Sequence, residues 1–113
     1  MNRLAIYERN LLWSVRLRKA AEQAGYAVQV VDHASPVEAE LAIVSLYDPD
    51  LSSEDLIAQL KAQGTLVIGH VGHKEKTEWE AGLGRGCDRV VSNSTLANRL
   101  AETLEGVLAA AQS

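Results

Sequence analysis

Short apolar runs alternate along the chain with segments in which apolar side chains recur at helical spacing. The apolar runs have the length of strands and lie at residues 4–7, 27–31, 41–44, 66–68 and 89–91. Residues 41–44 are apolar at every position, which is typical of a central parallel strand covered on both faces. The pattern therefore predicts five strands separated by helical segments.

The first two helical segments carry recognisable end signals. Asn10 is a candidate N-cap for a helix that Gly25 closes. Ser52 begins a capping-box-like Ser-Ser-Glu-Asp sequence, and Gly64 stops the helix that follows it.

The last two helical segments differ in the strength of their signal. A helix rich in charge is predicted over roughly residues 75–83, with Gly82 as an interruption. One final helix is predicted to begin near Ser94, because apolar residues then recur at spacings of four, four, three and one. These residues are Leu96, Leu100, Leu104, Val107 and Leu108.

Alternation of strands and helices predicts an α/β fold in three layers, a doubly wound parallel sheet with helices on both faces. Five strands in one domain, residues 1–113, fit the flavodoxin-like order 2-1-3-4-5. One connection is unusual, because only nine residues, with Pro36 near the middle, separate Val31 from Leu41. A parallel crossover with a helix takes about a dozen residues, whereas nine extended residues already reach about 30 Å. The second helix is therefore predicted to be absent or reduced to a turn.

Composition narrows the classes of function. Eleven basic and fifteen acidic residues leave a net charge of −4, which offers no excess positive field for direct binding of nucleic acid. The single Cys87 rules out an internal disulfide and a zinc site built on several thiolates. No apolar run has the length of a membrane span, and a cytoplasmic location without membrane attachment is expected.

Three segments together resemble the receiver domains of response regulators. Residues 40–50 are similar to the third strand of a receiver and the loop after it, which contains a proline. Gly86, Cys87 and Asp88 resemble the small turn before the fifth strand, and Ala24, Gly25 and Tyr26 resemble the end of the first helix. The resemblance implies a flavodoxin-like fold and a role in bacterial-type signal transduction.

The same resemblance implies that the phosphorylation site is degenerate. Receivers use two carboxylates after the first strand to help bind Mg²⁺, a third as the phosphoryl acceptor, a hydroxyl after the fourth strand and a lysine after the fifth. The aligned positions are Tyr7, Glu8, Ser45, His70 and Asn93, so only Glu8 keeps its chemistry. This predicts a pseudo-receiver that is not an enzyme, with no catalytic residue, metal or cofactor.

Other uses of the same residues stay open. A hydrolytic or small-molecule-binding domain could use Ser45, His70 and Glu8, although no Gly-x-Ser-x-Gly nucleophile elbow occurs. His70 and His73 with Glu8 could hold a metal, and Asp48 could be a displaced phosphoryl acceptor. Residues 82–86 are rich in glycine but lack the strand-before, helix-after context of a phosphate loop.

A surface for protein contact is the remaining expectation. In receivers, the fourth helix, fifth strand and fifth helix form the usual output and dimerisation surface. The corresponding candidates here are Trp79, Arg89, Arg99 and Glu102. Trp79 is either a contact anchor or a residue that packs against the sheet. The predicted partner is another protein or a second copy of the chain.

Overall fold

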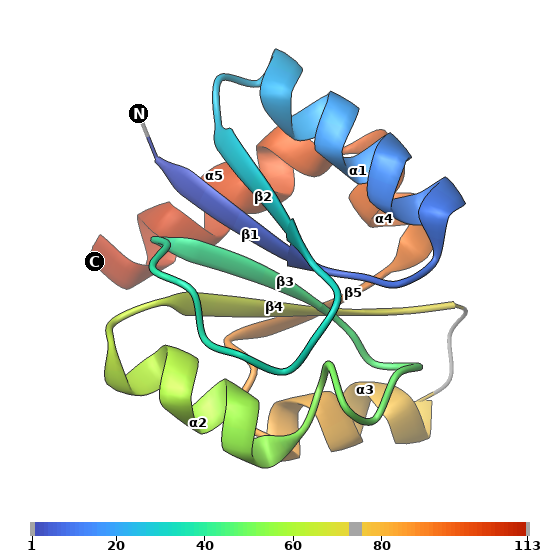
Figure 1. Ribbon diagram of the computed structural model, residues 1–113, viewed down its shortest axis with the longest axis vertical. Helices are drawn as coiled ribbons and strands as arrows, with labels where there is room; N and C mark the ends of the chain where they lie inside the picture. Colours follow the sequence, from blue (N-terminus) through green and yellow to red (C-terminus); the bar gives the residue numbers. More distant parts are fainter. Residues whose placement is uncertain (1, 73–75, 113) are drawn as a thin grey trace.

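Five parallel strands form one sheet in the order β2-β1-β3-β4-β5, with helices on both faces (Figure 1). The computed structural model describes residues 2–72 and 76–112. The strands are β1 (Arg3–Tyr7), β2 (Ala27–Val31), β3 (Leu41–Ser45), β4 (Leu66–Val71) and β5 (Arg89–Ser92). The helices are α1 (Leu11–Gln23), α2 (Glu54–Ala62), α3 (Lys76–Gly84), α4 (Asn93–Asn98) and α5 (Leu100–Gln112). The predicted fold class and strand order are confirmed.

Two apolar cores lie on opposite faces of the sheet. Helices α1, α4 and α5 cover one face, and α2 and α3 cover the other (Figure 1). Strand β3 separates the two cores, and all five of its residues are buried, as the apolar run at residues 41–44 predicts for all but Ser45. Ile43 belongs to the core under α1 and α5, whereas Ala42 and Val44 belong to the core under α2 and α3. Successive residues of a strand face opposite sides, and this alternation decides which side chains reach the candidate site.

The connection from β2 to β3 contains no helix, as its length predicts. Residues 32–40, all of them described, run as a loop over the sheet (Figure 1). The Tyr7 hydroxyl holds this loop, since it donates to the Ser35 carbonyl at 2.7 Å and accepts from the Val37 N–H at 3.1 Å. The Thr65 hydroxyl adds a bond to the Ala39 carbonyl at 2.7 Å. Side-chain hydrogen bonds thus fix the crossover where a helix would otherwise fix it.

We expect Tyr7→Phe to lower the free energy of unfolding by about 1–3 kcal/mol, because it removes two hydrogen bonds to partly buried backbone groups. Tyr7 is fully buried, so its ring would stay in place while the hydroxyl is lost. Urea denaturation of the full chain measures the change. Tyr26→Phe is the matched control, since no described residue forms a hydrogen bond with that partly buried hydroxyl. Equal losses for the two variants would contradict the role assigned to Tyr7.

The prediction of one continuous final helix is wrong. The chain forms α4 and α5, which Arg99 separates with φ −133° and ψ 42°. Thirteen residues of α5 already span about 20 Å, as long as the longest strand, so a helix continuous from Asn93 would overrun the sheet. Leu96 and Leu100, on either side of the break, both enter the core beneath α1.

Two other helix boundaries differ from the sequence prediction. Ser53, rather than Ser52, caps α2 by accepting the Leu56 N–H at 3.2 Å, while the Ser52 hydroxyl donates to the Asp48 carbonyl at 2.8 Å. Helix α3 continues through Gly82 to Gly84. A Cβ at Gly82 would lie 2.6 Å from Leu46 Cδ1, so this glycine permits close packing of α3 on the sheet rather than interrupting the helix.

Candidate functional site

A cavity of about 700 Å³ opens at the carboxyl ends of β1 and β3. The connections of these neighbouring strands leave in opposite directions, and ligands bind at such switch points in open α/β sheets. The loops after β1 and β3 and the start of α4 and α1 supply the walls. The lining residues are Glu8, Arg9, Asn10, Trp13, Ser45, Tyr47, Asp48, Pro49, Asp50 and Asn93.

A buried polar chain runs along one side of this cavity. His70 is 1% exposed, and its Nδ1 lies 2.5 Å from Asn93 Oδ1. Its Nε2 lies 3.1 Å from Glu8 Oε1, an ion-pair distance without the alignment of a hydrogen bond. The Asn93 amide in turn donates to the Tyr47 hydroxyl at 3.0 Å. Each ring nitrogen of His70 therefore faces an oxygen acceptor.

Ser45 pairs with His70 in the sheet register but is not activated by it. The serine is 2% exposed and lines the cavity, and none of the described residues gives its Oγ a hydrogen bond. Because both nitrogens of His70 face Asn93 and Glu8, neither is placed as a base for the serine hydroxyl. The arrangement does not provide the nucleophile–base contact of a hydrolase.

Of the predicted site residues, the structure brings Glu8, Ser45, His70 and Asn93 together and places Tyr7 elsewhere. Tyr7 belongs to the core under α2 and α3, on the opposite face of the sheet from His70. Burial raises the pKa of the Tyr7 hydroxyl, and the hydrogen bond from the Val37 N–H partly offsets that rise. Its hydroxyl serves the β2–β3 loop instead of the cavity.

The metal hypothesis for this end of the sheet gains no support from the geometry. His73 lies outside the described residues. Among the described residues, no group of three histidine, cysteine, aspartate or glutamate side chains converges as a metal site requires. Glu8 alone does not make the dense oxygen set that Mg²⁺ prefers.

Glu8 is held as a carboxylate despite being 7% exposed. Burial acts to raise its pKa, but the contact with His70 and the N–H groups of Asn10 and Arg9 outweigh that effect and lower the pKa below its ordinary value. The Asn10 N–H lies 3.1 Å from Glu8 Oε2. The folded protein therefore stabilises the charged form of Glu8.

This lowered pKa predicts a loss of stability in acid. Because the folded-state pKa lies below the unfolded value, Glu8 contributes stability above the unfolded pKa and loses it as pH falls through the folded pKa. Urea denaturation from about pH 6 to pH 3 covers this range. Glu8→Gln cannot titrate, so its stability deficit against wild type should shrink as the solution is acidified. A deficit that is constant with pH would contradict the assignment.

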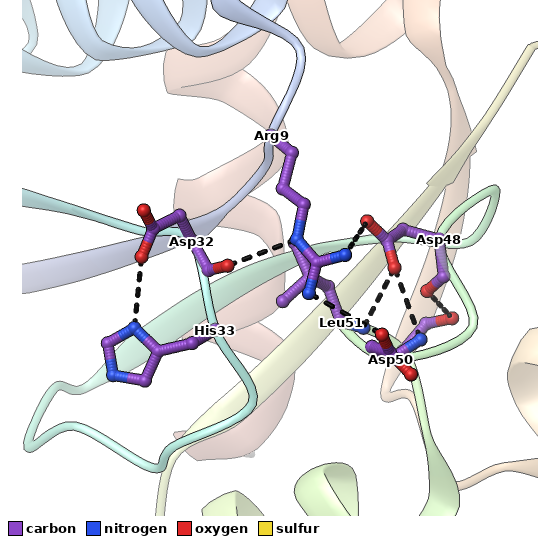
Figure 2. Close-up of polar contacts among 7 residues, drawn as sticks. Arg9, Asp32, His33, Asp48, Asp50 and Leu51 are labelled. Carbon is purple, nitrogen blue, oxygen red and sulfur yellow. Dashed lines mark hydrogen bonds and ion pairs between the residues drawn. The ribbon is translucent and has the colours of Figure 1, made fainter.

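Arg9 closes one wall of the cavity by joining three loops (Figure 2). Its guanidinium lies 3.4 Å from Asp48 and 3.6 Å from Asp50, and its Nε donates to the Asp32 carbonyl at 3.0 Å. Asp48 also accepts the Asp50 N–H at 3.1 Å, which tightens the loop after β3. Asp48 is thus engaged with Arg9 and with its own loop, and it is not placed as a free phosphoryl acceptor.

The predicted topology puts Arg9 and Tyr47, which follow the first and third strands, near this crevice, but it does not predict their contacts or the presence of Trp13. Trp13 belongs to α1, and it lines this cavity and a neighbouring one. Tyr47 is 57% exposed, stands edge-on to His70 and passes close to the Gly72 backbone. The sequence signal for Tyr47 is its position two residues after the third strand, with a single leucine between, which places an aromatic side chain at the edge of the crevice.

The residues predicted for protein contact lie on both sides of the sheet. Trp79 packs against the core under α2 and α3, and its Nε1 is buried with no acceptor among the described residues. Arg99 and Glu102 are exposed at the start of α5, on the other face of the sheet. The Arg99 Nη1 lies 3.8 Å from the Glu102 Oε2. Arg89 is half-buried against Gly106 of α5.

Comparison with known proteins rests on structure alone, since no family pattern and no curated protein matches the sequence. The receiver domain of the TMAO respiratory system response regulator TorR aligns at a TM-score of 0.78 and 20% identity, over 96% of this chain and 97% of that one. A response regulator from Thermotoga maritima aligns at a TM-score of 0.79 and 13% identity, over 96% of this chain and 98% of that one. The receiver domain of the Francisella response regulator 1452 aligns at a TM-score of 0.77 and 14% identity, over 95% of this chain and 96% of that one. The fold is that of a response-regulator receiver domain.

The receiver fold accounts for the convergence of Glu8, Ser45, His70 and Asn93 at one end of the sheet, because parallel strands bring their carboxyl ends to the same edge. Within the receiver fold, this chain lacks the helix that would join β2 to β3. Among its described helices, none combines the length and apolar character needed to cross a bilayer.

Proposed function

We propose that this chain is a pseudo-receiver, which works in signal transduction by binding another protein or a second copy of itself, without aspartyl phosphorylation. The observation that carries the proposal is Ser45, which occupies the end of β3 where the receiver resemblance puts the phosphoryl acceptor. A serine hydroxyl without a base is a poor nucleophile. It would act in the cytoplasm as a surface rather than as an enzyme.

The surroundings of Ser45 support the same proposal. Glu8 is the only carboxylate retained from the receiver set, and it is engaged with His70. Asn93 stands at the lysine position, so no ammonium group is available there to bind a phosphoryl oxygen. Glu8 and Asn93, two of the positions that a receiver would use for Mg²⁺ and the phosphoryl group, instead contact His70.

The direct test is incubation of the full chain with acetyl phosphate and Mg²⁺, followed by intact-mass measurement. A phosphorylatable receiver domain treated in parallel is the positive control. We expect no addition of a phosphoryl group, and beryllofluoride with Mg²⁺ should leave the amide resonances around Ser45 unshifted. A stable acyl phosphate on this chain would overturn the proposal.

The choice between another protein and a second copy is tested by measuring the mass in solution over a range of concentrations. Arg99 and Glu102 are exposed, so substitution there should leave the fold intact. A dimer that Arg99→Glu dissociates would assign the partner as a second copy through the start of α5. A monomer at every concentration would assign the surface to another protein.

A further inference from the structure

The cavity beside Ser45 has the size and lining of a small-molecule site. Its volume of about 700 Å³ falls within the range of about 300–1,000 Å³ in which ligand pockets lie. A second hollow of about 390 Å³ shares Trp13, Tyr47 and Asn93 with it. These three residues therefore border both hollows, so a molecule bound in either one would contact them.

One lining residue of the cavity offers a hydroxyl that no described residue binds. Ser45 is 2% exposed, and its hydroxyl receives no hydrogen bond from any described residue. The Ser45 Oγ is not one of the fully enclosed side-chain atoms that lack a partner, so it is open to the cavity and available to a ligand. A serine hydroxyl can both donate and accept, so it suits a ligand that presents N–H groups.

The charges around the cavity favour a cation. Glu8, Asp48 and Asp50 line it, and Arg9 is the only cationic side chain among the described residues that line it. The Arg9 guanidinium is already shared by Asp48 and Asp50. His70 lies behind Glu8 and faces that carboxylate rather than the open space. An anionic ligand such as phosphate would meet three carboxylates at this position.

The aromatic walls favour a planar organic cation over a metal ion. Trp13 and Tyr47 both line the cavity. Trp13 already accepts one guanidinium, since the Arg16 Cζ lies 5.5 Å from the centroid of its ring. Indole rings attract cations through the negative charge of their faces. The described residues offer no set of three metal-binding side chains here.

We propose that this cavity binds a small organic cation in which an amidinium or guanidinium group is attached to a flat apolar body. The cationic group lies against Glu8 and donates to the Ser45 hydroxyl, and the flat body contacts Trp13 and Tyr47. This inference builds on the proposed function, in which the crevice is not used for phosphoryl transfer. Occupancy of the crevice would then be the signal that changes how the domain binds its partner.

Benzamidine is a suitable probe, with benzamide as its neutral counterpart and benzoate and inorganic phosphate as anions. The readout is a titration of the full chain followed by NMR of the indole N–H of Trp13 and the amide N–H of Ser45. The indole N–H of Trp79, on the other face of the sheet, is the internal reference. We expect saturable shifts with benzamidine at a Kd of about 1 mM or tighter. Benzamide should bind at least tenfold more weakly.

Variants separate the parts of the site. Trp13→Leu should weaken benzamidine binding about tenfold and Ser45→Ala several-fold, while the exposed Gln59→Ala on α2 should leave it unchanged. Equal binding of benzamidine and benzamide, tighter binding of benzoate or phosphate, or no saturable shift would each overturn the inference. Phosphoryl uptake from acetyl phosphate is measured by mass in a separate experiment, so failure of the proposed function is recognised independently.

Discussion

Replacing His70 with alanine is expected to lower the free energy of unfolding by about 3 kcal/mol, because it leaves the buried Glu8 carboxylate and the Asn93 oxygen without the side chain that they face. His70 is 1% exposed and Glu8 is 7% exposed, so solvent cannot take over the lost contact. Urea denaturation near neutral pH measures the loss.

A double-mutant cycle identifies the buried charge as the cause. Glu8→Gln removes the carboxylate, so adding it to His70→Ala should restore part of the stability that His70→Ala alone removes. His70→Gln is the matched variant that keeps a polar group in the space. Strictly additive losses, or a loss below about 1 kcal/mol for His70→Ala, would show that the Glu8–His70 contact carries little free energy.

Most of the fold could be predicted because its determinants are local. Strand β3 is apolar at every position before Ser45, and the nine-residue connection after Val31 is too short for a helical crossover. The break at Arg99 could not be predicted in this way. Apolar spacing through Leu96 and Leu100 is compatible with one helix, and only the length of the sheet beneath it requires two.

The candidate site was predictable in its location but not in its contacts. Parallel strands bring Glu8, Ser45 and His70 to one edge of the sheet, so the resemblance and the topology together predict that these residues lie close to one another. Tyr7 was misplaced by the resemblance, because neighbours at the end of a strand face opposite sides of the sheet. Arg9 contacts loops that are distant from it in sequence, and no local pattern of residues predicts such contacts.

Introducing a carboxylate by Ser45→Asp is expected to destabilise the protein by about 3 kcal/mol at neutral pH, because a second buried anion would lie close to Glu8 without a compensating cation. Glu8 also lines this cavity, and position 45 is 2% exposed. Burial and the Glu8 charge would raise the folded-state pKa of the introduced group. The deficit should therefore grow as pH rises above about 4, the ordinary pKa of an aspartate.

Ser45→Asn separates charge from shape, since it has nearly the same size as the aspartate variant and no ionisable group. We expect it to lose less stability than Ser45→Asp and to show no additional dependence on pH. Millimolar Mg²⁺ should return part of the lost stability to Ser45→Asp alone, because the two carboxylates together would bind the ion in the folded state only. Equal stability of the two variants at neutral pH would show that the pocket tolerates a second carboxylate. The charges around Glu8 and His70 would then not explain why position 45 holds a serine instead of an aspartate. The absence of a phosphoryl acceptor would have to be explained by function alone.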